Sequence, residues 1–247
     1  MAEARAEVER VPFGRLPTGE AVDAFVLRGA GGAEVRVTGY GGAIVSLRVP
    51  DREGRLADVV LGYDDVLGYV DDDAYFGALI GRYGNRIRGG RFTLDGQEYA
   101  LPVNNGPNHL HGGPRGFHKV LWAAEPVRTA EGVGVALAYD SPDGDQGYPG
   151  ALRARVTYLL DDRNQLSVGY EAETDRPTIV NLTQHSYFNL TGDPTRTILG
   201  HRLRLEAGRF TPTDDTLIPT GELAPVAGTP FDFGEAAAIG ARIGADD

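Results

Sequence analysis

The stretch that decides the fold spans residues 151–172 and reads ALRARVTYLL, DDRN and QLSVGYEA in succession. In its first part Leu152, Ala154, Val156 and Tyr158 alternate with other residues, so they lie on one face of an extended chain. The turn formers of DDRN then connect this run to a second alternating run. We therefore predict two half-buried antiparallel strands joined by a hairpin.

The same strand pattern recurs along the chain. Residues 33–38 alternate apolar and polar side chains, and Asp95-Gly96 separates two short strand-like runs with a strong hairpin signal. The 35 glycines and 15 prolines break the remaining apolar runs into short pieces, which favours strands over helices. Only residues 64–70 and 235–243 resemble helices, and both are weak. An all-β antiparallel protein follows.

Composition narrows the possible partners. The net charge of -11 would repel phosphate backbones and anionic lipid, so we expect no nucleic acid and no membrane partner. The absence of cysteine excludes disulfides and thiolate chemistry.

The N-terminus lacks an apolar targeting segment, which predicts a cytoplasmic protein. With no internal repeat or linker, residues 1–247 are predicted to form one domain.

A loop rich in glycine, proline and histidine covers residues 104–118, NNGPNHLHGGPRGFH. If His109 to His111 were extended, both imidazoles would point to one side, as in an H-x-H metal site. Alternatively, neutral imidazoles could donate and accept hydrogen bonds with sugar hydroxyls. We favour the sugar interpretation over the metal interpretation.

Residues 181–192, NLTQHSYFNLTG, form a second polar segment. In a strand, alternation would place Asn181, Thr183, His185, Tyr187 and Asn189 on one face. Such a row suits the lining of a polyol pocket, although a plain solvent-facing surface would have the same pattern.

A third segment, Gly81–Ile87, carries Arg82, Asn85 and Arg86 among glycines that allow close approach of a ligand. It lacks the Lys-Ser/Thr pair of a nucleotide-binding loop and the spacing of a dinucleotide fingerprint. Nucleotide binding is therefore not predicted.

Taken together, these segments resemble the aldose 1-epimerase (galactose mutarotase) family in order and in spacing. The matching motifs cover most of the chain: Gly81–Ile87, Asn104–Gly113, Phe117–Trp122, Gly147–Gly150, Asn181–Leu190 and Leu217–Glu222. The resemblance implies a large antiparallel β-sandwich with few short helices and an enzyme that interconverts the α and β anomers of free aldohexoses such as galactose or glucose.

The resemblance also implies roles for individual residues. His185 would be the general acid that protonates the sugar ring oxygen. Asn85, Arg86, His111 and Tyr187 would contact the sugar, while neither His109 nor His118 inherits a role. No metal and no organic cofactor is implied, the partner is a small-molecule sugar, and the protein is expected to be a monomer or weak dimer.

The family supplies its general base, a glutamate, and a further sugar-binding acidic residue from the C-terminal part of the chain. This sequence ends near where the acidic residue is expected, so we assign no base and predict an incomplete sandwich. We expect these residues alone to show little mutarotase activity by polarimetry.

Three other functions compete with this one. A carbohydrate-binding module would keep the sugar cleft without the chemistry. A cupin-like metalloenzyme would bind a metal ion through His109 and His111. A hexose-phosphate epimerase could use Arg82 and Arg86 to hold a phosphate.

Overall fold

A computed structural model describes residues 6–245. The chain forms two compact units, Met1–Phe188 and Asn189–Asp247. The larger unit contains two antiparallel sheets and the smaller unit contains short two-stranded ladders. Our expectation of one domain over residues 1–247 stays a prediction.

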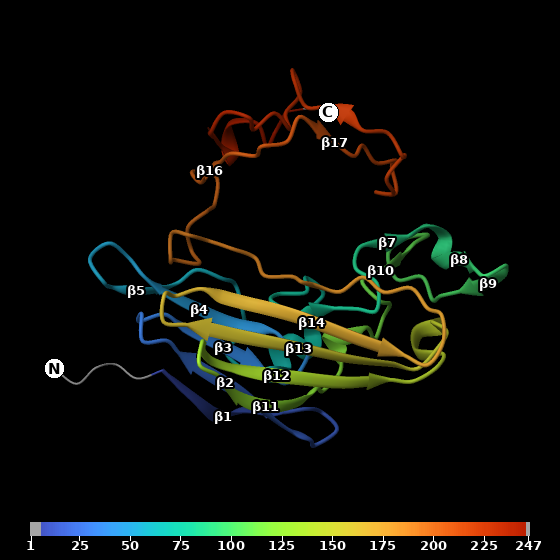
Figure 1. Cartoon of the computed structure of the whole chain (residues 1–247). Helices are drawn as coiled ribbons and strands as arrows, with labels where there is room; N and C mark the ends of the chain where they lie inside the picture. Colours follow the sequence, from blue (N-terminus) through green and yellow to red (C-terminus); the bar gives the residue numbers. More distant parts are fainter. Residues whose placement is uncertain (1–5, 246–247) are drawn as a thin grey trace. The chain divides into compact units, whose positions relative to one another are not determined.

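The first sheet of the larger unit has five strands in sequence order, each antiparallel to the next. These strands are β1 (Glu7–Arg15), β2 (Ala21–Arg28), β3 (Glu34–Thr38), β4 (Ile44–Pro50) and β5 (Leu56–Asp58). The second sheet runs in the order β11 (Ala123–Arg128), β12 (Gly132–Ser141), β13 (Leu152–Asp161) and β14 (Leu166–Thr174). Figure 1 shows the first sheet in blue and the second in green to orange.

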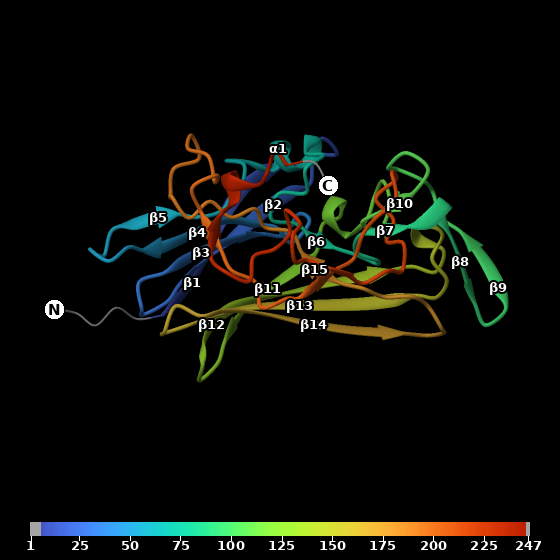
Figure 2. The same ribbon diagram turned by 90° about the horizontal axis from the view of Figure 1, so that it is seen from above.

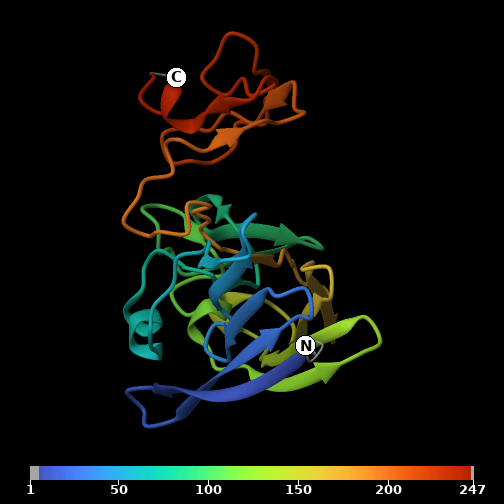
Figure 3. The ribbon, with the colours of Figure 1, turned by 90° about the vertical axis from the view of Figure 1, so that its left-hand side faces the viewer.

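The two sheets enclose a shared apolar core. Leu27 and Val35 from the first sheet belong to the same buried cluster as Leu137 and Val156 from the second. All four side chains are at most 1% exposed. The inward-facing residues follow the alternation of the sequence, because successive side chains of a strand point to opposite faces. The predicted β-sandwich is therefore confirmed, and Figure 3 views its sheets from another side.

The outer face of the first sheet is also covered. Val22 and Phe13 pack in a second cluster with Val66 and Tyr69 of the short helix α1 (Val66–Asp71). Asp65 caps this helix by accepting the N–H groups of Leu67 and Gly68. The sequence placed a short helix over residues 64–70, in agreement with α1.

The predicted hairpin at Asp95-Gly96 is present between β8 (Arg91–Leu94) and β9 (Gln97–Ala100). Asp95 has φ 51° and Gly96 has φ 80°. Positive φ at both central residues is the requirement of a two-residue type I′ turn. Figure 2 shows this hairpin at the end of the larger unit opposite to β5.

Two small ladders carry the polar segments singled out in the sequence. Strand β6 (Leu79–Ile80) pairs with β15 (Thr183–Gln184), and β7 (Arg86–Ile87) pairs with β10 (His109–Leu110). The expectation of one strand along residues 181–190 is wrong, because β15 contains only two residues. The chain leaves this ladder after Gln184.

In the smaller unit β16 (Arg202–Leu203) pairs with β19 (Ala237–Ala238), and β17 (Arg209–Phe210) pairs with β18 (Ala224–Pro225). The weakly predicted helix over residues 235–243 is replaced by β19 and a 3-10 turn, η4 (Ile239–Ala241). Further 3-10 turns are η1 (Arg88–Gly90), η2 (Phe117–Lys119) and η3 (Asp145–Gly147). Within residues 6–245, no helix has the length and hydrophobicity needed to cross a membrane.

The shared core predicts a large cost for truncating one of its residues. Leu137 is 0% exposed, so Leu137→Ala should lower the free energy of unfolding by about 2–5 kcal/mol, through lost burial and a residual cavity. Leu67, which is 47% exposed, provides the matched control, and Leu67→Ala should change the free energy of unfolding by less than about 0.5 kcal/mol. Urea unfolding measures both; equal effects would contradict a core between the two sheets.

Candidate functional site

His111 is held in one orientation by a reciprocal pair of hydrogen bonds with Asn85. The His111 N–H donates to the Asn85 carbonyl at 3.1 Å, and the Asn85 N–H donates to His111 Nδ1 at 2.9 Å. Because Nδ1 accepts a hydrogen bond, the neutral ring carries its proton on Nε2. Both residues adopt positive φ, 52° for His111 and 64° for Asn85. His111 therefore offers Nε2–H as a hydrogen-bond donor.

The electrostatic surroundings keep His111 neutral. Burial, followed by His185 and the Arg86 guanidinium, lowers the pKa of His111 to about 4. At neutral pH this ring is a donor without a positive charge.

His185 lies directly beside His111. Its N–H donates to the Ala78 carbonyl at 2.9 Å, and its carbonyl accepts the Gly77 N–H at 3.2 Å. The half-buried His185 ring lies 5.1 Å from the His111 ring, centroid to centroid, with the planes 82° apart. The backbone thus fixes a pair of imidazoles that come from segments 74 residues apart (185 − 111).

Aromatic rings extend the site beyond the two histidines. The Tyr187 ring lies 5.2 Å from His185 and 5.0 Å from Phe76. Tyr187 is 40% exposed, so its ring is available to a ligand. Its carbonyl accepts the Leu61 N–H at 3.0 Å, which anchors this part of the chain.

Arg86 and Asn85 lie side by side at the start of β7. Arg86 Nε donates to Asn105 Oδ1 at 2.8 Å, and Nη1 donates to Asn85 Oδ1 at 3.3 Å. These amides orient the guanidinium, and its positive charge contributes, after burial and His185, to the lowered pKa of His111. All five residues predicted to act on the sugar, His185, Asn85, Arg86, His111 and Tyr187, thus belong to one connected cluster.

Sequence reasoning missed Tyr75, which lies among the histidines. The Tyr75 ring is 4.8 Å from His111, 4.6 Å from His118 and 5.6 Å from His185. His118 is 7% exposed, and its Nδ1 has no hydrogen-bond partner among the described residues. No periodic pattern marked Tyr75, because it lies in a turn with φ 62°.

His109 does not join this cluster. It is 0% exposed, with Nδ1 2.7 Å from the Pro102 carbonyl and Nε2 2.7 Å from the Tyr148 hydroxyl. The tautomer that satisfies both contacts donates from Nδ1 and accepts from Tyr148. The metal interpretation of His109 and His111 therefore fails, since the positive φ of His111 turns its ring towards Tyr75 and His185. Residues 6–245 contain no group of three metal-binding side chains.

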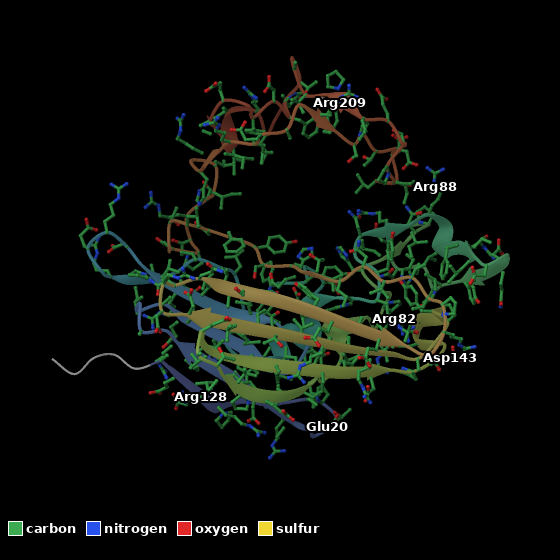
Figure 4. The ribbon with its side chains drawn as sticks, viewed as in Figure 1. Glu20, Arg82, Arg88, Arg128, Asp143 and Arg209 are labelled. Atoms are coloured by element: carbon green, nitrogen blue, oxygen red, sulfur yellow. The ribbon has the colours of Figure 1, made fainter. Side chains whose placement is uncertain are left out.

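Arg82 is also not available to a ligand. Its five N–H groups donate to Ser141 Oγ and to the carbonyls of Ser141, Pro142, Pro149 and Gly150, at 2.7–3.1 Å. Arg82 is 1% exposed, and Figure 4 shows it near Asp143, where β13 begins and β14 ends. The suggestion that Arg82 holds a sugar phosphate is therefore wrong.

The polar face expected along residues 181–190 ends after Tyr187. Asn189 is 6% exposed, and its Nδ2 donates to the carbonyls of Asp193 and Arg196 within the smaller unit. This side chain stabilises a turn.

Known proteins share both the sequence and the fold. Residues 23–247 match the family model for aldose 1-epimerase. Galactose mutarotase of Sus scrofa is 47% identical over 237 residues, which cover 96% of this chain and 68% of the relative. Aldose 1-epimerase of Escherichia coli K12 is 40% identical over 231 residues, covering 94% and 66%. The crystal structure of galactose 1-epimerase from Lactobacillus acidophilus has a TM-score of 0.88 at 30% identity, covering 98% of this chain and 70% of that one.

The buried histidines predict how stability depends on pH. The pKa values of His111 and His118 are lowered to about 4 and about 3, mainly by burial, whereas the unfolded chain titrates near 6.5. Below pH 6.5 the unfolded state therefore binds more protons. The free energy of unfolding should fall between pH 6.5 and 4 by up to about 1.4 kcal/mol per pH unit for each histidine.

Urea unfolding at several pH values measures this slope. His118→Asn removes one titrating ring and should reduce the slope. An unchanged slope in that variant would contradict the burial of a neutral His118.

Proposed function

The chain belongs to the aldose 1-epimerase family, and we propose that the site around His111 and His185 interconverts the anomers of a free aldohexose such as galactose or glucose. Family membership confirms the sequence-based prediction of a sugar mutarotase. The observation that best supports the assignment of residues is the fixed Nε2–H tautomer of neutral His111 beside His185.

The reaction needs two coordinated proton transfers. A base removes the proton of the anomeric hydroxyl, the bond between C1 and the ring oxygen breaks, and the ring oxygen receives a proton from an acid. Rotation about the C1–C2 bond then allows closure on the other face of C1, with both transfers reversed. We assign the acid role to His185, and we assign no base among residues 6–245.

His111 and His185 would have different roles in the reaction. His111 remains neutral above about pH 4, so it donates a hydrogen bond from Nε2 to a sugar oxygen without competing for the proton. A neutral neighbour also avoids repulsion against His185 when that ring carries the proton.

The remaining residues suit recognition of a sugar. Arg86 and Asn85 offer hydrogen bonds to hydroxyls, and both are already oriented by neighbouring amides or backbone groups. The exposed ring of Tyr187 offers an apolar face for the carbon skeleton. This combination of a few polar groups with aromatic walls is typical of small-molecule sites.

Replacement of His185 tests the proposal. Because no base is assigned, we expect little activity from the chain: it should accelerate mutarotation of freshly dissolved α-galactose by about 10²-fold at most, the lower end of what one positioned acid contributes, and His185→Ala should return the rate nearly to the uncatalysed value. Polarimetry measures both rates. His201→Asn is the control, because His201 Nε2 accepts the Leu190 N–H at 2.8 Å within the smaller unit.

The outcomes separate the possible functions. If His185→Ala retains most of the acceleration, the assignment of the acid is wrong. If titration calorimetry shows that galactose binds but polarimetry shows no acceleration, a carbohydrate-binding module is favoured. Faster turnover of glucose 6-phosphate than of glucose would favour a hexose-phosphate epimerase that uses Arg86.

Three further proposals concern the partner, the oligomeric state and the location of the protein. Sugar is the proposed small-molecule partner, and we propose a monomer or weak dimer in the cytoplasm. Sedimentation equilibrium tests the oligomeric state.

A further inference from the structure

Lys119, the only lysine of the chain, has an unusual set of partners. Its Nζ donates to three carbonyls, those of Tyr69 at 3.0 Å, Val70 at 2.8 Å and Asp72 at 2.6 Å. An ammonium has three N–H donors and no acceptor, so this arrangement uses the whole group in its charged form. Lys119 is therefore bound to the backbone and is not a free surface charge.

The three carbonyls lie at the end of α1. The last carbonyls of a helix have no partner within the helix and carry partial negative charge, so a cation stabilises them. The last turn of α1 contains no basic residue of its own. Lys119 supplies the cation from the 3-10 turn η2, 47 residues further along the chain than Asp72.

Asp72 fixes the turn that follows the helix. Its Oδ1 accepts the Ala74 N–H at 2.9 Å and the Tyr63 hydroxyl at 3.0 Å, while Oδ2 accepts the Phe76 N–H at 3.0 Å. Asp72 is 8% exposed, so these bonds are shielded from water. Two groups therefore hold the turn over residues 72–76. Lys119 binds the Asp72 carbonyl, and the Asp72 carboxylate binds the backbone N–H groups of Ala74 and Phe76.

The residue presented by this turn is Tyr75. Its φ of 62° is rarely adopted by a bulky residue, so the surrounding bonds must hold it. The Tyr75 ring contacts all three histidines of the cluster, His111, His118 and His185, at centroid distances of 4.6–5.6 Å. A shift of the turn would therefore move the ring against which His111 and His185 pack.

We propose that Lys119 is a positioning residue, which holds the turn over residues 72–76 so that Tyr75 forms a fixed wall behind His111 and His185. The expected effect of Lys119 on the mutarotation rate rests on the proposed function, but its expected effect on the Tyr75 ring and on the pKa of His111 does not. Without the ammonium, the end of α1 loses its counter-charge and the Tyr75 ring becomes mobile. Water then reaches His111, whose pKa should rise from about 4 towards 6.5, because burial is the main cause of the low value.

The absence of cysteine permits a sharp test of the charge. Lys119→Cys introduces a unique thiol, which can be alkylated in the unfolded chain before refolding. Bromoethylamine builds a side chain of nearly the length of lysine with its terminal ammonium. Bromopropane builds one of the same length that ends in a methyl group, and this is the matched control.

The main readout is the titration of the His111 ring by NMR, assigned with His111→Asn. In the aminoethyl form the pKa of His111 should stay near its native value, and in the propyl form it should be higher by one unit or more. Polarimetry should show a kcat loss of up to about 100-fold in the propyl form, recovered in the aminoethyl form, with a smaller change in KM. A folded propyl form with the native His111 titration would overturn the proposal.

A second variant covers the case in which the propyl form does not fold. Tyr75→Leu leaves Lys119 and its carbonyl partners in place but removes the ring. Its His111 pKa should rise in the same direction, and an unchanged value would show that Tyr75 is not the wall. If the native chain does not accelerate mutarotation, the proposed function fails, while the NMR titrations still decide the role of Lys119.

Discussion

The buried guanidinium of Arg82 connects the site to the sandwich. Burial of a charge is costly unless all its donors are satisfied, and all five N–H groups of Arg82 have partners between Ser141 and Gly150. Burial lowers the pKa of Arg82, while Asp145 and Asp143 oppose that change. The end of the second sheet is thereby bonded to the segment that carries Asn85 and Arg86.

The backbone around Arg82 extends this connection to His185. The Arg82 carbonyl accepts the Asn181 N–H at 2.9 Å, and the Asn181 carbonyl accepts the Gly84 N–H at 2.8 Å. From there β15 leads to His185, whose own backbone bonds to Ala78. The proposed acid and the proposed sugar-binding residues therefore share one hydrogen-bonded support. Such support fixes the geometry before a ligand binds, which reduces the cost of orientation in the reaction.

Local backbone conformation adds to this preorganisation. Tyr75, Asn85 and His111 all have positive φ, and all three contact the histidine cluster or belong to it. Such conformations are unfavourable for residues other than glycine, so they persist only where surrounding bonds hold them. The packed sandwich supplies that restraint, and the side chains of these residues consequently point where an extended strand would not direct them.

The sequence by itself determined the sandwich strands and the Asp95-Gly96 hairpin, because alternation and turn chemistry act between near neighbours. The resemblance of its motifs to the aldose 1-epimerase family grouped His185, His111 and Arg86 as candidates. The tertiary structure decided that Arg82 and His109 are buried structural groups and that Tyr75 belongs to the site. It also limited the strand of the polar segment to Thr183–Gln184. These outcomes depend on partners tens of residues away and on single positive φ values that reverse the direction of a side chain, and neither leaves a periodic trace in the sequence.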